Sequence, residues 1–315
     1  MKSALLYGGL ALAVAALVAH ALLEGDAPPQ DSATAVAAAP FDAKPEPAPV
    51  RRRSDGMPLA GRMPNESLPT WRMAQAFARS GDLRAFALDA ATRPAEGGLA
   101  YAREARRQCK AIRRSLRMSA PPTGRYGARE ADQGDAQRER AAASLSQRCA
   151  AFTKQELLPD EGEDDERLAA AGDVVARLML QAQRATASGD EGEIRLALRN
   201  VLEMRDPLAL DEALWPLMLK RTAGGAARVV IDSRAWSGDE LAIASDAASL
   251  LSCDLGRDCG ERDLEVASRC VERAGCFTSL RELRLASHAG SQAAFDAVWT
   301  ALRDIVETAD ESRLR

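Results

Sequence analysis

The residues that most often carry catalysis are scarce in this chain. Its 315 residues include two histidines, and His20 lies in the apolar amino-terminal segment, so the predicted folded part holds only His288. One histidine excludes a histidine metal cluster and a two-histidine mechanism there. A Ser-His-Asp triad would have to use His288, and the sequence holds no Gly-x-Ser-x-Gly turn and no Gly-x-x-x-x-Gly-Lys phosphate loop. A hydrolase that uses two carboxylates stays an alternative, although no acidic pair stands out. We therefore predict no catalytic residue, no metal site and no cofactor.

Six cysteines are the next residues with chemistry of their own. An even number in an exported chain favours disulfides, and export is indicated by the amino terminus described below. A helix of roughly eleven residues, about 16 Å long, separates Cys259 from Cys270, so these two sulfurs cannot meet. We predict the bridges Cys109–Cys149, Cys253–Cys259 and Cys270–Cys276. Zinc ligands usually come in closer pairs, and a Cys-x-x-Cys redox pair is absent from the sequence.

A strongly cationic helix is predicted over residues 101–118. One face is apolar, because the following residues recur at helical spacing: Tyr101, Ala105, Cys109, Ile112 and Leu116. A second face is basic and consists of Arg103, Arg107, Lys110, Arg114 and Arg117. Arg106 and Arg113 lie beside this face. The five residues of the basic face are the candidate anion-binding or partner-binding site, which could hold an acidic partner, a lipid headgroup or a polyanion.

An acidic run provides an intramolecular alternative for this basic face. The run holds six carboxylates, Asp160, Glu161, Glu163, Asp164, Asp165 and Glu166, which could lie against the helix and neutralise it. Its carboxylates are adjacent and do not alternate around a central glycine, so it does not fit a calcium-binding loop. We interpret the run as the exposed start of a helix.

The amino terminus predicts the compartment. Residues 5–23 carry no formal charge and would span roughly 28 Å as a helix, which is close to the thickness of a bilayer. Lys2 precedes this segment and Glu24 and Asp26 follow it, so the positive-inside rule places the rest of the chain across the membrane. We predict a retained signal-anchor. The alternative is a cleaved signal peptide, because Ala19-His20-Ala21 offers small residues at a signal-peptidase site.

Residues 24–67 form a predicted tether that is rich in proline and alanine. Such a composition cannot bury enough apolar surface to offset chain entropy, so we expect disorder. Arg51, Arg52 and Arg53 lie within it, and we interpret them as solvated arginines, with a headgroup contact or a processing site as alternatives.

The composition of the body favours an all-α fold. Val, Ile and Thr total 28 residues, whereas Ala, Leu and Arg dominate every segment. The helices are expected near 68–80, 82–93, 96–118, 134–156, 164–187, 190–203, 208–221, 238–252, 261–274, 276–288 and 290–312. Ser-Gly-Asp joints begin at Ser80, Ser188 and Ser237 and favour αα-hairpins. The lone strand-like segment, Val229-Val230-Ile231, is interpreted as a helix end or a buried connector.

These features predict a single-pass inner-membrane protein of a bacterium with its body in the periplasm. The body would be a disulfide-stapled array of αα-hairpins in two helical subdomains, residues 68–157 and 158–315. We expect it to bind or scaffold another envelope protein, or an anionic lipid or glycan, without catalysis. A net charge of −4 gives no basic excess for nucleic acid. The alternatives are an envelope hydrolase that uses paired carboxylates and a secreted soluble binding module.

Overall fold

The computed structural model describes residues 68–118, 133–158, 164–221, 225–272 and 275–314. All of these residues belong to one compact unit, residues 58–315. The predicted membrane segment, the tether and its arginine cluster lie outside the described residues. None of the helices that the structure describes is both long and apolar enough to cross a membrane.

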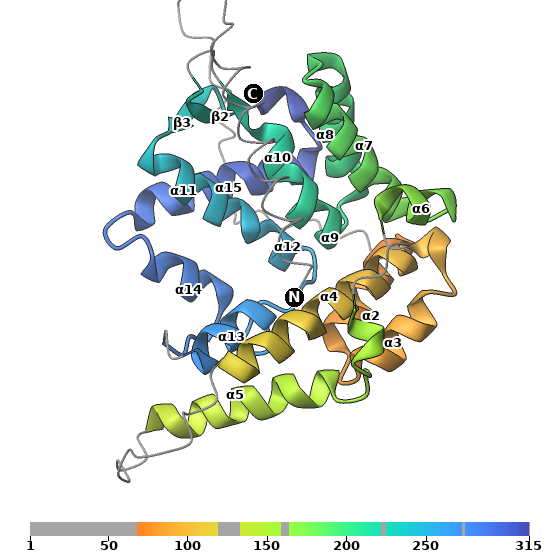
Figure 1. Ribbon diagram of the computed structural model, residues 1–315. Coiled ribbons are helices and arrows are strands. Elements are labelled where there is room, and N and C mark those ends of the chain that lie inside the picture. Colours follow the sequence, from red (N-terminus) through yellow and green to blue (C-terminus); the bar gives the residue numbers. More distant parts are fainter. Residues whose placement is uncertain (1–67, 119–132, 159–163, 222–224, 273–274, 315) are drawn as a thin grey trace, which may run out of the picture. The chain divides into compact units, whose positions relative to one another are not determined.

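The described fold is mostly helical, as the composition predicts (Figure 1). Its α-helices are α2 (Pro69–Arg79), α3 (Leu83–Ala90), α4 (Gly98–Met118), α5 (Gln133–Cys149), α6 (Asp165–Ala170), α7 (Val174–Ser188), α8 (Glu191–Met204), α9 (Pro207–Ala209), α10 (Trp215–Met218), α11 (Asp239–Ser249), α12 (Leu251–Asp254), α13 (Leu264–Val271), α14 (Leu280–Ala286) and α15 (Gln292–Thr308). Short 3-10 turns are η1 (Pro94–Glu96), η2 (Gln155–Leu157) and η4 (Glu311–Arg313), and η3 (Leu210–Leu214) is a π-helical turn.

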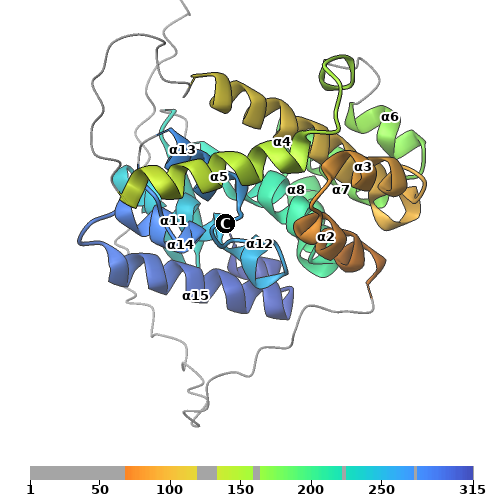
Figure 2. The same cartoon turned by 90° about the horizontal axis from the view of Figure 1, so that it is seen from below.

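Helix α4 is the centre of the first helical group. Its apolar face is buried against α2, α3 and α5, and the rings of Phe77, Phe86 and Tyr101 form a small aromatic cluster. A disulfide joins Cys109 of α4 to Cys149 of α5, with 5.4 Å between their Cα atoms. Helix α5 also packs on α13, and Figures 1 and 2 show it running beside α4. These contacts fix α4, which carries most of the predicted site residues.

The predicted helix 164–187 is wrong as a continuous helix, because the structure divides it into α6 and α7. The chain turns at Gly172, whose φ of 92° suits glycine. Asp173 then begins α7 by accepting hydrogen bonds from the N–H groups of Val175 (3.0 Å) and Ala176 (2.8 Å). Its second oxygen accepts from the N–H groups of Leu99 (2.8 Å) and Ala100 (3.2 Å) at the start of α4. One fully buried carboxylate therefore caps two helices.

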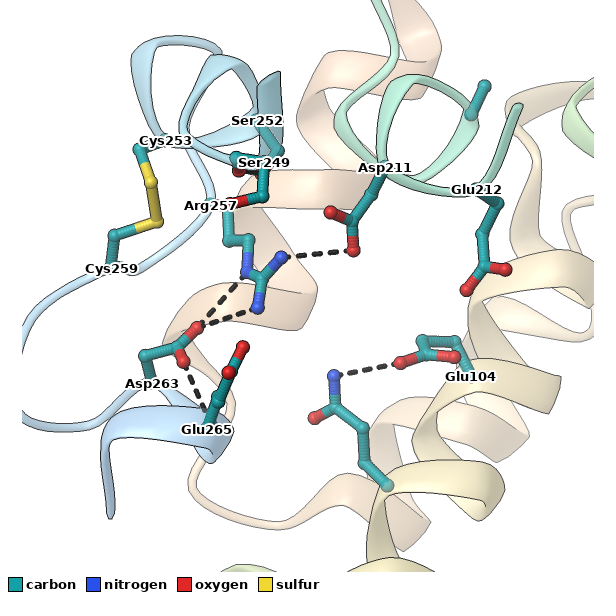
Figure 3. A network of polar contacts seen from close by, with 12 residues as sticks. Glu104, Asp211, Glu212, Ser249, Ser252, Cys253, Arg257, Cys259, Asp263 and Glu265 are labelled. Carbon is teal, nitrogen blue, oxygen red and sulfur yellow. Dashed lines mark hydrogen bonds and ion pairs between the residues drawn. A yellow bond between two sulfur atoms is a disulfide. The ribbon is translucent and has the colours of Figure 1, made fainter. Parts of the chain in front are cut away.

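The helix predicted over 208–221 is interrupted as well. Asp206 begins α9, the π-helical turn η3 follows, and α10 ends at Met218. Pro216 has no N–H to donate, so it removes a hydrogen bond from the helical ladder at this point. An inserted π turn is one way in which a helix accommodates such a loss. The turn places Asp211 and Glu212 on the side of the helix that faces α4 (Figure 3).

The interpretation of Val229–Ile231 as a helix end or connector is wrong. This segment belongs to β2 (Ala227–Ile231), the middle strand of a small antiparallel sheet with β1 (Lys220–Arg221) and β3 (Arg234–Ser237). Strands β2 and β3 are joined by Asp232 and Ser233, which have φ values of 51° and 64°. Positive φ at both central residues is typical of the tight turn that joins such strands.

The C-terminal helices close the fold around this sheet. Helix α15 packs on α11, and its residues Phe295, Val298 and Leu302 are buried. Near the end of the chain, Arg313 forms ion pairs with Asp232 and Asp304. The other two disulfides, Cys253–Cys259 and Cys270–Cys276, hold the segments before and after α13. All three disulfides join the cysteine pairs that the spacing predicts.

The described helices on the two sides of residue 158 pack against one another. Helix α4 contacts α6, α7 and α13, and α5 contacts α13. Asp173 follows residue 158 in the chain, and it caps α4, which precedes residue 158. The division into two subdomains at residue 158 stays a prediction, and these contacts tie the two segments into the same unit.

Candidate functional site

The N-terminal half of the predicted basic face is neutralised within the protein. Arg103 forms an ion pair with Asp165 at 2.6 Å. Arg107 forms ion pairs with Glu104, one turn before it, and with Glu212 of η3. The predicted neutralisation by the acidic run therefore applies to Arg103, which pairs with Asp165. Arg107 is neutralised by carboxylates outside that run.

The rest of the acidic run divides between other partners. Asp164 begins α6 by accepting a hydrogen bond from the N–H of Arg167 at 2.8 Å, which agrees with the predicted helix start. Glu166 forms an ion pair with Arg184 at 3.0 Å. Residues 160, 161 and 163 lie outside the described residues. Within the described ranges, no cluster of three or more His, Cys, Asp or Glu side chains could hold a metal ion.

The C-terminal half of α4 and the residue before η2 carry a different surface, which we call the cationic face: Lys110, Arg114 and Arg117 of α4, with Lys154. All four are exposed, and they make no hydrogen bond or ion pair through their side chains with any described residue. Arg113 lies beside them and donates hydrogen bonds to the carbonyl oxygens of Cys149 (3.4 Å) and Phe152.

A groove with a volume of about 730 Å³ lies along this face. Its described lining consists of the cationic face with Ala111, Arg113, Leu157 and Leu158. Leu158 is 56% exposed, which is unusual for a large apolar side chain in this fold. The described lining of the groove includes no carboxylate. Among the described residues, the groove therefore combines positive charge that has no paired carboxylate with an apolar floor, a combination that suits an anionic partner.

A second concavity lies where α2, α4, α5 and α9–η3 meet the segment between α12 and α13. This cleft has a volume of about 230 Å³. Its apolar lining comes from Ala74, Phe77, Ala78, Pro207, Leu208 and Leu264. Its polar lining comes from Tyr101, Glu104, Arg107, Gln108, Arg148, Asp211, Arg257, Asp258, Arg262, Asp263 and Glu265. Residues from five separate parts of the chain therefore form one charged cleft.

The Cys253–Cys259 disulfide holds the segment that carries Arg257 into this cleft (Figure 3). The backbone N–H of Arg257 donates to the carbonyl of Ser252 at 3.0 Å. Its guanidinium spans two carboxylates, with 3.0 Å to Asp211 of η3 and 3.0 Å to Asp263 at the start of α13. The arginine thus links the C-terminal segment to the π-helical turn across one end of the cleft.

Two carboxylates on the cleft wall are desolvated. Burial raises the pKa of Glu104, although Arg107 and a hydrogen bond from Gln108 at 2.9 Å oppose the shift. Burial also raises the pKa of Asp211, with Arg257 acting in the opposite direction. Raised carboxyl pKa values are what a hydrolase with paired carboxylates needs. Each of these carboxylates already forms an ion pair with an arginine, however, and that arrangement suits electrostatic binding better than proton donation.

Arg148, at the end of α5, is the least exposed arginine residue that lines the cleft, since 8% of the residue is exposed. It donates hydrogen bonds to the carbonyls of Ser80 (3.3 Å) and Arg262 (3.2 Å) and forms no ion pair with a described carboxylate. Burial and then the nearby charge of Arg262 lower its pKa, and the charges of Asp258 and Asp263 oppose this shift.

Beneath the cleft, Tyr101 donates a hydrogen bond at 3.0 Å to Asp206, which is fully buried. Burial raises the pKa of Asp206 to about 7. A carboxyl group whose pKa is higher in the folded state stabilises the fold most below its unfolded value, near 4, and this contribution is lost as the pH rises through 7.

We expect Asp206→Asn to remove this pH dependence, because asparagine keeps an oxygen for the Ala209 N–H and does not ionise. From about pH 4 to pH 8, the free energy of unfolding of the wild type should fall relative to the variant by up to about 4 kcal/mol. Urea unfolding of both proteins across this range measures the difference. Parallel pH profiles for the two proteins would contradict the shifted Asp206.

The sequence identified the cationic face in part and missed the cleft. Arg107 belongs to the predicted basic face of the helix, but the structure places it in the lining of the cleft and not in the cationic face. Nothing near Arg148 in the sequence distinguishes it from other helical arginines. His288 lies apart from both sites and bonds to Asp246 at 2.7 Å. The chain matches no protein-family model, no curated protein and no solved structure.

Proposed function

We propose that this protein is a membrane-anchored periplasmic binding or scaffold protein of the bacterial envelope. Its anchor would be residues 5–23, and its body an array of αα-hairpins with the cationic face as its docking surface. The partner we favour is an acidic segment of another envelope protein. Anionic lipid and glycan are alternatives that the experiment below distinguishes.

One observation carries this proposal. Along a single helix, Arg103 and Arg107 are paired with carboxylates, whereas Lys110, Arg114 and Arg117 have no such partner in the described residues. Like charges grouped on one face repel one another, so this grouping costs free energy unless an anion compensates it. The groove floor formed by Leu157 and Leu158 supports a protein segment, since such a segment also brings apolar side chains.

The docking surface is tested by charge reversal in the full-length protein. Lys110→Glu, Arg114→Glu and Arg117→Glu would be combined, and partners recovered from gently solubilised membranes would be quantified by mass spectrometry. The matched control is Arg177→Glu with Arg195→Glu, since both arginines are exposed on α7 and α8. We expect a stoichiometric envelope protein to be recovered with the wild type. Its recovered amount should fall at least tenfold with the charge-reversed variant and should be unchanged with the control.

Other outcomes would contradict parts of the proposal. A partner that stays bound to the reversed variant would show that the cationic face is not the docking surface. Enrichment of anionic lipid or glycan alone, lost in the same variant, would replace the protein partner with that ligand. Neutralising Asp160, Glu161 and Glu163 gives a further comparison. Tighter capture by that variant would show that the acidic run competes for the face.

The anchoring part of the proposal is tested separately. The intact mass of the chain recovered from membranes shows whether residues 1–23 are retained. A chain that begins after residue 21 and occurs in the soluble periplasmic fraction would favour the secreted binding module.

A further inference from the structure

Arg148 is desolvated in the cleft and forms no direct ion pair with a described carboxylate, although the charges of Asp258 and Asp263 partly compensate it. Its two hydrogen bonds go to neutral carbonyl oxygens, and the residue is 8% exposed. Removing a cation from water is costly unless an opposite charge faces it. A guanidinium group offers five N–H donors, and these two bonds use only part of that capacity. The remaining donors suit the two oxygens of a carboxylate.

The other charges around Arg148 already have partners. Asp263 accepts from Arg257 and caps α13 by accepting from the N–H of Glu265 at 2.9 Å. Asp258 accepts from the N–H of Gly260 at 3.1 Å and lies 3.8 Å from the guanidinium of Arg262. Glu265 forms an ion pair with Arg284 at 2.7 Å. Arg148 is therefore left as the site in this cleft for an incoming anion.

A second wall of the same cleft is suited to a cation. Figure 3 shows Asp211 and Glu104 on neighbouring elements, with Arg257 bound to Asp211. Glu104 accepts a hydrogen bond from Gln108 at 2.9 Å and pairs with Arg107. Burial raises the pKa of both carboxyl groups, so an ammonium group nearby would stabilise their charged forms. Asp211 is the more accessible of the two, because about a third of its side chain remains exposed.

The apolar lining and the size of the cleft limit the ligand further. Phe77, Leu208 and Leu264 provide apolar lining in the same cleft. A volume of about 230 Å³ lies below the usual range for drug-sized ligands, so it suits a molecule of one or two amino acid residues. An oligosaccharide or a nucleotide would exceed it.

We infer that the cleft binds a small amphoteric ligand, an apolar amino acid or a dipeptide. Arg148 holds its carboxylate, Asp211 and Glu104 face its ammonium group, and Phe77, Leu208 and Leu264 contact its side chain. None of these six residues belongs to the cationic face, so this site is independent of the proposed partner surface.

Isothermal titration calorimetry with the full-length protein tests the site. The probes are L-leucine and alanyl-leucine, with leucinamide and N-acetyl-leucine as forms that each lack one charge. We expect leucine or alanyl-leucine to bind, and leucinamide to bind at least tenfold more weakly because Arg148 loses its anion. N-acetyl-leucine should also bind more weakly. The affinities of leucine and alanyl-leucine are then compared, and the tighter-binding probe shows whether the site favours an amino acid or a dipeptide.

Three variants accompany the probes. Arg148→Gln should weaken leucine or dipeptide binding at least tenfold. Ala78→Trp fills the cleft without changing a charge and should have the same effect. Arg195→Gln, on the exposed side of α8, is the control and should bind as the wild type does. Thermal unfolding of each variant identifies a loss of binding that comes from misfolding, and the leucinamide comparison requires no variant.

The inference is overturned by any of three results. These are the absence of binding for both amphoteric probes at millimolar concentration, equal binding of leucine and leucinamide, and full binding by a folded Arg148→Gln variant. Charge reversal of Lys110, Arg114 and Arg117 should leave leucine binding unchanged. The failure of one site therefore does not imply the failure of the other.

Discussion

Asp173→Ala is expected to destabilise the protein by about 3–5 kcal/mol, more than an ordinary helix-cap substitution does. Its carboxylate accepts four backbone hydrogen bonds, two at the start of α7 and two at the start of α4. Because Asp173 is fully buried, water cannot replace the carboxylate at these N–H groups. The substitution would also remove the negative charge that faces two helix N-termini.

A matched control separates this double role from ordinary capping. Asp190 caps α8 and accepts from the N–H groups of Gly192 (2.8 Å) and Glu193 (2.9 Å), but it is exposed and serves one helix. Asp190→Ala should therefore cost only about 1 kcal/mol. Asp173→Asn should lie between the two, because its single amide oxygen can serve only one of the helix starts. Urea unfolding measures all three. Equal losses for Asp173→Ala and Asp190→Ala would show that the link to α4 contributes no stability.

The features that sequence reasoning predicted correctly depend on neighbours in the chain. The joint at Ser188 is one example, because Gly189 ends α7 with a φ of 68° and Asp190 begins α8. The disulfide pairs are another, since the length of a helix limits which sulfurs can meet. The buried face of α4 follows from helical periodicity, and Ala105, Cys109 and Ile112 are all fully buried.

The sheet was missed because its turn has unusual residues. Strands β2 and β3 pair from Arg228↔Ser237 to Ile231↔Arg234 across a loop of two residues, Asp232 and Ser233. Asn-Gly or Asp-Gly is the common sequence for such a turn, whereas serine at positive φ is uncommon. The β-branched run Val229-Val230-Ile231 was the available signal. Its burial alternates in the structure, since Val229 and Ile231 are buried and Val230 is only partly buried, but its sequence does not alternate in polarity. A search for a partner strand two residues away would have found Trp236, which pairs with Val229.

The cleft could not be predicted from local patterns, because distant segments form it. Arg148 donates a hydrogen bond to the carbonyl oxygen of Arg262, which lies 114 residues further along the chain. Gln75 donates to the carbonyl oxygen of Gly256 at 2.8 Å, across 181 residues. Such contacts depend on how the helices pack, which helical periodicity does not specify. Helical periodicity likewise predicted a single basic face along the whole helix, of which the cationic face is one part. Glu104 supplies Arg107 with a carboxylate from within α4, whereas Asp165 of α6 and Glu212 of η3 approach α4 only in the folded protein.

Removing the Cys109–Cys149 disulfide should destabilise the protein by about 4 kcal/mol, the largest effect expected for any of the three bridges. These cysteines are 40 residues apart, whereas each of the other pairs is separated by 6. A bridge that closes a longer loop removes more conformations from the unfolded chain, and the same chain-entropy model gives about 2 kcal/mol for a short loop. Cys109 and Cys149 are also buried, so replacing them leaves less packing between α4 and α5.

The comparison uses two double variants, Cys109→Ala with Cys149→Ala and Cys270→Ala with Cys276→Ala. Urea unfolding under non-reducing conditions should show a loss for the first variant that exceeds the second by about 2 kcal/mol. The effect should extend to binding, because the bridge fixes α5 against α4 and Arg148 directly precedes Cys149. In the first variant we therefore expect weaker leucine or alanyl-leucine binding at urea concentrations where the fold remains intact. Equal stability losses for the two variants would show that loop length does not determine how much each bridge stabilises this fold.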